Sequence, residues 1–403
     1  MSDVLKAAPV IAPSVDTGVI SLPAGFEFNQ VLNPGVAKEL LAPAPPPTLG
    51  PLQAFVGTFA GGGFNTIFRP NSPLTPTPLP NPSTDPIKDN VLELNLTKES
   101  LAFSPSLGSV PNRGAHEADA FLNGVPYLQT VQDITDANNP VGIHVEPGIW
   151  ICVPPTDEED QQTLVRMASI PHGTTICAQG TSTTIAGPPT IPAAPITPFG
   201  IGSNAPQLFT FPSQTLGNSS TQRLPQVLAG STIPITQAML DDPNSVLRDH
   251  IAGQNIVSTT EISITTHGTP PTVFKAGGTS NIDFLAAAQG NANTVKMDAT
   301  FWIETIEHVI HLPILDPKDP PVTLQPDVGH PALHRPTFIG VAPGPIPAGR
   351  VLRVHSTQIQ YSQTVLLNFG PLSWPHVSVA TLTPAGPILI PPGAWNAAAA
   401  LHG

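Results

Sequence analysis

Positively charged residues are scarce in this chain. Lysine and arginine together number 15 in 403 residues, against 28 aspartates and glutamates, which gives a formal net charge of -13. Nucleic-acid binding relies on clusters of cations that neutralise phosphates, so the composition excludes a nucleic-acid partner and equally disfavours an anionic membrane surface. We therefore expect the partner to be a small-molecule ligand.

Cysteine and long apolar runs are also lacking. Only Cys152 and Cys177 are present, too few for a disulfide framework in a chain of this length. Both fall in strand-like runs, so they are either two separate buried thiols or a cross-strand contact. No apolar stretch reaches the roughly 20 residues of a membrane helix, and Met1–Lys6 lacks the start of a secretion signal. We expect no membrane span and a cytoplasmic location.

Familiar catalytic motifs are absent as well. The sequence has no Gly-x-Ser-x-Gly elbow, no Walker loop, no dinucleotide fingerprint between a strand and a helix, and no His-Glu-x-x-His pair. The triplet Gly61–Gly63 lies inside a strand-like run with no helix after it, so it indicates a bend rather than a phosphate cradle. These absences leave open whether the protein is an enzyme.

Proline, by contrast, is abundant and sets the domain organisation. The chain has 52 prolines, clustered in segments that can be neither helix interior nor central strand. The pattern predicts one β-rich domain with long decorating loops. Its expected parts are an extended N-terminal arm over residues 1–51, a barrel domain over 52–385 with insertions at 180–253 and 316–350, and a C-terminal tail over 386–403.

Alternation of apolar and polar residues predicts roughly ten strands. In 91–103, for example, leucines alternate with polar residues, the period-2 signature of a half-buried strand. The other expected strands are 55–69, 127–134, 141–153, 164–170, 173–184, 255–266, 282–287, 294–308, 351–369 and 377–382. Asp242-Pro243 predicts the start of a short helix that ends at Gly253, after a shorter helical turn. We expect a mainly β protein, an antiparallel β-barrel with one or two short helices; the strand pattern also permits a sandwich.

The strand expected over 351–369 carries an unusual polar row. Gln358, Gln360, Ser362 and Thr364 share one face, and Tyr361 lies on the opposite, apolar face. We expect the polar row to face solvent, the alternative being the lining of a ligand cavity.

Two segments at the ends of the expected barrel resemble a known family. Gly57-Thr58-Phe59-Ala60-Gly61-Gly62-Gly63-Phe64 opens it, and Trp374-Pro375-His376-Val377-Ser378-Val379-Ala380-Thr381-Leu382 closes it. This pairing is similar to that of the nitrobindin-like haem barrels, a lipocalin-like family. The resemblance implies a haem b pocket with His376 as the iron ligand at the start of the last strand. It also implies first-strand glycines that bend across the barrel mouth.

The resemblance further suggests which residues contact the cofactor. We expect Phe59, Gly61, Gly63, Tyr361 and Trp374 to lie around it. The family usually carries tryptophan at the position of Phe59, and its barrels are far shorter than this chain, so the insertions here must lie outside the barrel or over its mouth.

His376 is also a candidate on its own residues. It shares a strand face with the small residues Ser378 and Ala380, which leave room for a flat ligand. Neutral imidazole is a good axial ligand for haem iron, and an acceptor at its other nitrogen would fix the tautomer. The alternative is a structural histidine that packs beside Trp374.

His144 and His172 are the candidate catalytic residues. In a haem pocket either could donate a hydrogen bond to a small ligand on the side opposite His376, or transfer a proton. Alternatively, His144, Glu146 and His172 could bind a single metal ion as in cupins, although Pro147-Gly148 signals a turn that would end the strand. A structural role at a sheet edge or turn is the third possibility.

Together these features favour a haem-binding β-barrel that handles a small ligand or carries out a peroxide-type oxidation. One alternative is a metal-free, calycin-like carrier of an apolar molecule, in which Trp150, Trp302 and Trp374 orient the cargo. Another is a structural protein whose proline-rich surface mediates self-assembly, and a homo-oligomer fits that case.

Overall fold

The computed structural model describes the chain from residue 47 onward, with gaps. The described residues are 47–71, 75, 90–116, 118–156, 161–202, 206–218, 224, 233–268, 277–286, 291–327, 329–330, 333–347 and 349–399. Most of the N-terminal arm expected over 1–51 therefore lies outside them.

The long strands lie close to where the alternation places them. The strands are β1 (Gly57–Pro70), β2 (Asn90–Phe103), β3 (Val110–Asn112), β4 (Ala120–Asp133), β5 (Val141–Val153), β6 (Thr163–Ile170), β7 (Thr174–Ala186), β8 (Phe199–Gly200), β9 (Ile256–Thr265), β10 (Gly278–Asn281), β11 (Asn293–His311), β12 (Val322–Leu324), β13 (Phe338–Gly340), β14 (Val351–Phe369), β15 (Leu372–Pro384) and β16 (Ile388–Leu389). The helices are short: η1 (Gly50–Ala54), η3 (Pro212–Gln214), α1 (Gln237–Asp241), α2 (Ser245–Ile251), α3 (Asp283–Ala286) and α4 (Pro392–Ala399).

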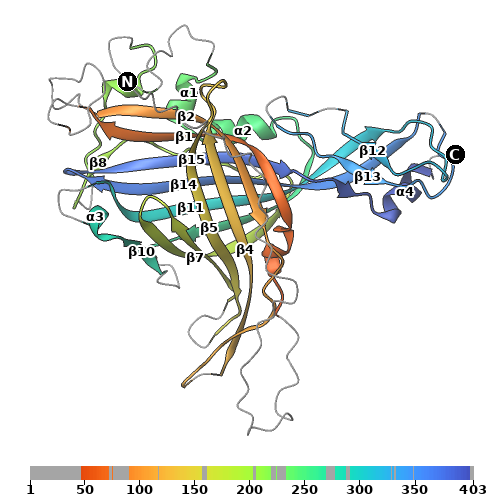
Figure 1. Cartoon of the computed structure of the whole chain (residues 1–403), viewed down its shortest axis with the longest axis horizontal. Helices are drawn as coiled ribbons and strands as arrows, with labels where there is room; N and C mark the ends of the chain where they lie inside the picture. Colours follow the sequence, from red (N-terminus) through yellow and green to blue (C-terminus); the bar gives the residue numbers. More distant parts are fainter. Residues whose placement is uncertain are drawn as a thin grey trace, which may run out of the picture.

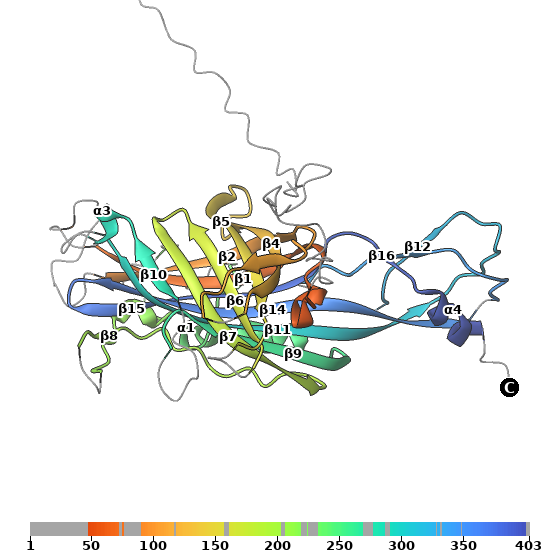
Figure 2. The same cartoon turned by 90° about the horizontal axis from the view of Figure 1, so that it is seen from below.

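Ten of the described strands form a closed antiparallel β-barrel (Figures 1 and 2). Their order around the barrel is β1-β2-β4-β5-β6-β7-β9-β11-β14-β15, and β1 pairs with β15 to close it. The expected fold class, an antiparallel barrel of roughly ten strands with few short helices, is confirmed. The period-2 pattern predicts it because every barrel strand presents alternate side chains to the interior and to the outside.

Gly61 and Gly63 lie at the seam, where β1 pairs with β15, and they explain how β1 closes the barrel. A Cβ atom at Gly61 would lie 2.0 Å from the backbone oxygen of Thr381, and one at Gly63 would lie 1.8 Å from that of Val379. Glycine is therefore required here for the close approach of two backbones.

One expected strand is wrong. The run 282–287 contains the helix α3 instead of a strand, since a short apolar run rich in alanine suits either and the neighbouring β10 already pairs with β7. Strand β5, by contrast, has the expected bounds 141–153, because the turn signal at Pro147-Gly148 does not end it. Its pairing with β6 begins only at Gly148, so Pro147 has no β6 residue opposite it and its missing N–H interrupts no ladder bond on that side.

The barrel interior has an aromatic half and an open half. At one end Phe55 stacks on Phe103 with ring centroids 4.6 Å apart, and Trp150 packs edge-on against Phe301 at 5.1 Å. Phe59 packs against Phe103. These five rings, Phe55, Phe59, Phe103, Trp150 and Phe301, form an aromatic plug. The other half holds a cavity, so the plug forms the floor beneath any ligand.

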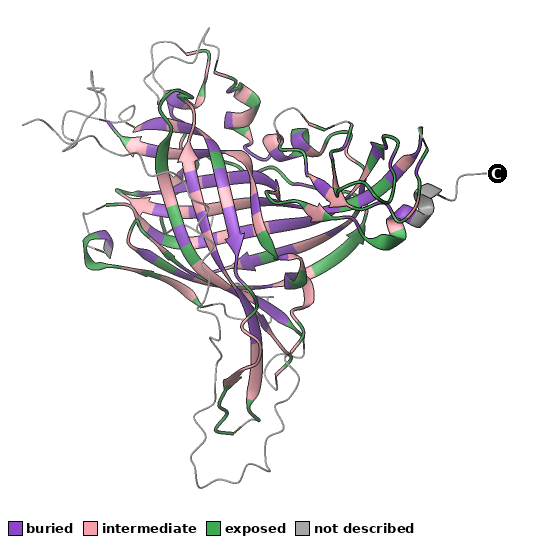
Figure 3. Ribbon diagram, turned by 45° about the vertical axis from the view of Figure 1, so that its right-hand side comes forward, coloured by how far each residue is buried: buried purple, intermediate pink, exposed green. Residues whose placement is uncertain are grey.

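Described parts of the segment between β7 and β9 cover the outer face of the barrel at β1, β2 and β15. They include α2, which contacts β1 and β15, and η3, which contacts β2. The polar row of β14 lies on this outer face, as expected, but Gln358 and Gln360 are buried instead of solvated, because Gln360 Nε2 donates to the backbone oxygen of Leu247 in α2. Figure 3 shows buried positions alternating with less buried ones along the barrel strands.

The second insertion builds a smaller core at the end of the barrel away from the cavity. Beyond Ile306, β11 has no pairing with β9, and β11 and β14 continue as a hairpin. The small sheet β12-β13-β16 and α4 lie beside this hairpin (Figure 1). Its buried residues are Ile310, Leu312, Leu315, Leu324, Phe338, Ala342, Ile346, Leu352, Val354, Ile390 and Trp395. Residues 388–395, expected as a tail, thus contribute to a core.

Two further findings bear on the sequence-based expectations. Cys152 and Cys177 are free thiols, and burial raises the pKa of each. Among the described residues, no helix is long and apolar enough to cross a membrane.

Candidate functional site: a histidine-lined cavity

The open half of the barrel contains a cavity of about 590 Å³. This volume lies in the range of small-molecule and cofactor sites. The mouth lies where β14 ends, β11 begins and the β6–β7 turn and α3 approach each other. The described residues that line it are Asn65, Ile67, Glu93, Asn95, Glu99, Gln129, Val131, Ile143, His144, Ile170, Pro171, His172, Thr174, Phe284, Leu285, Asn291, Ala292, Thr294, Tyr361, Gln363, Val365, Leu367, His376 and Ser378.

His376 stands on the β15 wall with its tautomer fixed. Its Nδ1 lies 2.9 Å from the backbone oxygen of Thr66 on β1, and because a carbonyl can only accept, Nδ1 carries the proton. Burial lowers the pKa of His376 to about 4, so the imidazole is neutral at neutral pH. Its Nε2 lone pair then has no hydrogen-bonding partner among the described residues.

His144 and His172 stand together on the opposite side. Their rings are 5.7 Å apart, His144 on β5 and His172 in the β6–β7 turn. Around the barrel, β1, β2 and β4 separate β5 from β15 in one direction, and β6, β7, β9, β11 and β14 separate them in the other. His376 therefore lies across the cavity from the histidine pair. Burial, and after it the proximity of His144, lowers the pKa of His172.

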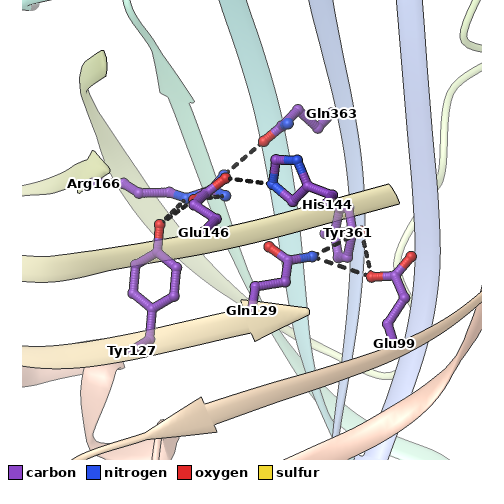
Figure 4. Close-up of polar contacts among 8 residues, drawn as sticks. All are labelled: Glu99, Tyr127, Gln129, His144, Glu146, Arg166, Tyr361 and Gln363. Atoms are coloured by element: carbon purple, nitrogen blue, oxygen red, sulfur yellow. Dashed lines mark hydrogen bonds and ion pairs between the residues drawn. The ribbon is translucent and has the colours of Figure 1, made fainter. Parts of the chain in front are cut away.

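The buried ion pair between Glu146 and Arg166 contacts His144 through Glu146 (Figure 4). Glu146 Oε1 accepts from Arg166 Nη2 at 2.6 Å, and Glu146 Oε2 lies 3.2 Å from His144 Nε2. Burial, the largest single influence, would raise the pKa of Glu146, but the charge of Arg166 together with the contacts to His144 and Tyr127 outweighs it and lowers that pKa to about 2. Since the ionised carboxylate accepts, His144 Nε2 carries a proton and Nδ1 is the atom left to gain or lose one.

Tyr127 completes the ion-pair network. Its hydroxyl donates to Glu146 Oε1 and accepts from Arg166 Nε at 2.8 Å. Its ring occupies the space that a side chain at Gly148 would fill, because a Cβ there would lie 2.5 Å from the ring. Burial raises the pKa of Tyr127 well above 10, so the hydroxyl keeps its proton.

A second buried carboxyl group lies on the cavity floor. Glu99 Oε2 accepts from the Tyr361 hydroxyl at 2.6 Å and from Gln129 Nε2 at 3.1 Å, and Oε1 accepts from Thr97 at 2.8 Å. Burial raises the pKa of Glu99, and the hydrogen bonds from these neutral donors oppose that rise. Figure 4 shows this group beside the His144 network.

Four of the expected site residues meet in the cavity and four do not. His144, His172, Tyr361 and His376 line it. Phe59 lies in the aromatic plug, and Gly61 and Gly63 lie at the β1–β15 seam. Trp374 stacks on Phe369 with ring centroids 4.6 Å apart and also packs on Phe68 and Phe211, away from the cavity wall.

The cupin-type alternative gains no support from the geometry. Glu146 is occupied by Arg166 and Tyr127, and within the described parts of the chain no group of three His, Cys, Asp or Glu side chains could hold a metal ion. This finding concerns sites built from protein ligands alone and does not test a haem, whose iron needs one histidine.

Sequence reasoning missed Glu99, Gln129 and Arg166. Each lies at a strand position that faces the barrel interior. The sequence signal that could have found them is a polar residue on the same strand face as apolar core residues. In β2, for instance, Glu99 alternates in phase with Leu101 and Phe103.

Comparisons with known proteins leave the family open. No family model matches the chain, and no curated protein matches it. Among solved structures, the crystal structure of Rv2717c from M. tuberculosis aligns over 84% of this chain and 98% of that one, at 11% identity and a TM-score of 0.31.

Proposed function

We propose that this protein is an enlarged nitrobindin-like barrel that binds haem b, with His376 as the axial ligand of the iron. The observation that carries the proposal is the state of His376: a neutral imidazole on the cavity wall, with Nδ1–H held by the Thr66 carbonyl. Haem proteins commonly fix the proximal histidine in this way, with the other nitrogen's lone pair free for the metal.

The rest of the cavity fits a flat, mostly apolar ligand. Ile67, Val365 and Leu367 offer apolar surface around His376, and Ser378 is small. His144 and His172 face the same cavity from the opposite side, so a planar group on His376 would leave its second face toward them. When bound, haem would supply an iron centre for a small ligand such as a diatomic gas or a peroxide.

The chain's own part in a peroxide-type oxidation is proton handling. Glu146 holds the Nε2–H of His144, which leaves Nδ1 to accept a proton from a ligand in the cavity and return it. Arg166 keeps Glu146 ionised, so the carboxylate stays an acceptor and His144 keeps one tautomer. His172 offers a second imidazole in the same place.

Absorption spectroscopy tests the proposal directly. The purified protein is titrated with haemin, and a sharp Soret band with one-to-one stoichiometry is expected. His376→Gly should shift the band and weaken binding about tenfold or more, and added imidazole should restore the spectrum by occupying the space of the missing side chain. His116→Ala, at an exposed histidine, is the matched control.

Two results would overturn the haem proposal. One is the lack of a saturable Soret band. The other is a Soret band that is the same in the parent protein, in His376→Gly and in His116→Ala. Either would remove His376 as the ligand whatever the fate of the other histidines.

A metal-free carrier of an apolar molecule is the second candidate. It is favoured by the lining, which among the described residues includes no lysine or arginine to pair with haem propionates. The tryptophans expected to orient a cargo do not line the cavity: Trp150 lies in the plug, and Trp302 donates to Glu261 on another strand. A carrier would bind a lipophilic dye with unchanged affinity in His376→Gly, and haemin would not displace it.

A further inference from the structure

We propose that this cavity admits uncharged, largely apolar ligands and excludes anionic groups, which must stay outside its mouth. Glu93 and Glu99 set this selectivity. The inference concerns the charge of the ligand and holds for an iron-free cavity; only its last experimental arm rests on the proposed haem function.

The wall of the cavity carries two carboxyl groups. Glu93 and Glu99 both line the cavity from β2, Glu99 on the floor and Glu93 nearer the mouth. Glu99 carries either no charge or a negative one, so it offers an anion no attraction in either state. A negative ligand beside a buried carboxyl group would also raise the cost of that group's ionisation, because charges interact strongly away from water.

The described lining offers no lysine or arginine to compensate for these carboxyl groups. Arg166 lies just behind the wall, but its guanidinium is already engaged by Glu146 at 2.6 Å, Gln363 at 2.7 Å and Tyr127 at 2.8 Å. His376 and His172 have lowered pKa values because they are buried, so at neutral pH they add no positive charge. His144 also lines the cavity, and its Nε2 is already engaged by Glu146 Oε2 at 3.2 Å.

The cavity offers a neutral ligand apolar surface and uncharged hydrogen-bonding groups. Apolar side chains on several strands and on α3 surround it, among them Ile67, Val365 and Phe284. Neutral donors and acceptors at Asn65, Gln129 and Gln363 can orient such a ligand without charge pairing. An anion entering here would lose its hydration and receive no ion pair in return.

Two dyes with one skeleton test the charge rule on the apo protein. N-phenyl-1-naphthylamine is uncharged, and 1-anilinonaphthalene-8-sulfonate adds a sulfonate to the same rings. At neutral pH we expect the uncharged dye to bind at least about tenfold more tightly. Ser378→Phe, which fills the cavity beside His376, should abolish binding of the uncharged dye and so locate it.

Removing the carboxylates should reduce the difference in affinity between the two dyes. Glu93→Gln and Glu99→Gln are each expected to improve sulfonate binding several-fold relative to the neutral dye. Asp136→Asn makes the same charge change in the exposed β4–β5 turn and should alter neither affinity. Should Glu99→Gln fail to fold, Glu93→Gln on the less buried position decides the point. Equal or tighter sulfonate binding, no binding of either dye, or a preference that both variants leave unchanged would overturn the proposal.

Haemin offers a separate arm, because it carries two propionates. Under the charge rule these groups must point out of the mouth, so haemin dimethyl ester should bind at least as tightly as haemin. A large loss of affinity for the ester would overturn the rule. Failure of both haem compounds to bind, with the dye preference intact, would overturn the haem function and leave the charge rule standing.

Discussion

Arg166 and Glu146 form an ion pair inside the barrel, with Nη2 and Oε1 2.6 Å apart. Both side chains are almost completely buried. The pair keeps a negative charge next to His144, and its energetics follow from its burial: breaking it leaves one charge in a medium that cannot solvate it.

We therefore expect Arg166→Met to be strongly destabilising. Removing one partner of a buried ion pair typically costs about 3–5 kcal/mol, because the remaining charge has no counter-ion. The double variant Glu146→Gln with Arg166→Met should recover most of that loss, since no buried charge remains. The free energy of unfolding from urea titration measures both. If Arg166→Met alone were as stable as the parent, water would have to reach the ion pair, and the prediction would fail.

Glu304 makes the stability of the protein fall as pH rises between about 4.5 and 8. It is fully buried, its Oε1 has no hydrogen-bonding partner among the described residues, and burial raises its pKa to about 8. The folded protein keeps this proton after the unfolded chain has released it near the ordinary value of 4.5. The unfolded state thus binds fewer protons in this window, so Glu304 lowers stability as pH rises from about 4.5 to 8.

Replacing Glu304 with glutamine should remove that dependence. Glu304→Gln is expected to gain stability relative to the parent as pH rises toward 8, because glutamine has no proton to lose. Unfolding free energies at several pH values measure the difference. Glu261→Gln, on the neighbouring strand β9, is the control. Parallel pH curves for parent and Glu304→Gln would contradict the assignment.

The alternation of residues predicts the barrel well but not which face of each strand points inward. In β2 the leucine face of Leu92 and Leu94 is covered by the insertion outside the barrel, while Glu93, Asn95 and Glu99 face the cavity. A single sequence cannot reveal this, because the covering segment is a distant proline-rich loop. The polar row of β14 was misjudged in its burial for the same reason.

The candidate site was predictable where one residue carries its own signal. His376 stands out beside Pro375, although β15 begins at Leu372 and the histidine lies inside the strand instead of at its start as expected. His144 and Glu146 share a face through period-2 spacing. The contacts among Glu99, Tyr361 and Gln129 join residues on three strands, and Gln129 and Tyr361 are 232 positions apart. Such contacts depend on strand order and register, which alternation does not give.

His250 should make the protein sensitive to acid. It is a buried residue of α2 with Nδ1 2.9 Å from Thr381 Oγ1, and burial, followed by the nearby His330, lowers its pKa to about 4. The unfolded chain takes up a proton near 6.5, so stability falls as pH drops from about 6.5 to 4. His250→Gln should flatten this acid limb in unfolding experiments, whereas His116→Gln, at an exposed histidine, should not. An unchanged limb in His250→Gln would contradict the prediction.

Gly63 should tolerate no side chain, because it lies at the seam that closes the barrel. An added Cβ would approach the Val379 carbonyl oxygen to 1.8 Å, so Gly63→Ala must push β1 away from β15 or leave their hydrogen bonds unmade. We expect a loss of at least about 2 kcal/mol in unfolding free energy. Gly142→Ala is the matched control on another barrel strand, since nothing lies within 4 Å of its Cβ position. Equal stability of the two variants would mean that the seam is looser than this register allows, and that the opening glycines of β1 serve some purpose other than closure.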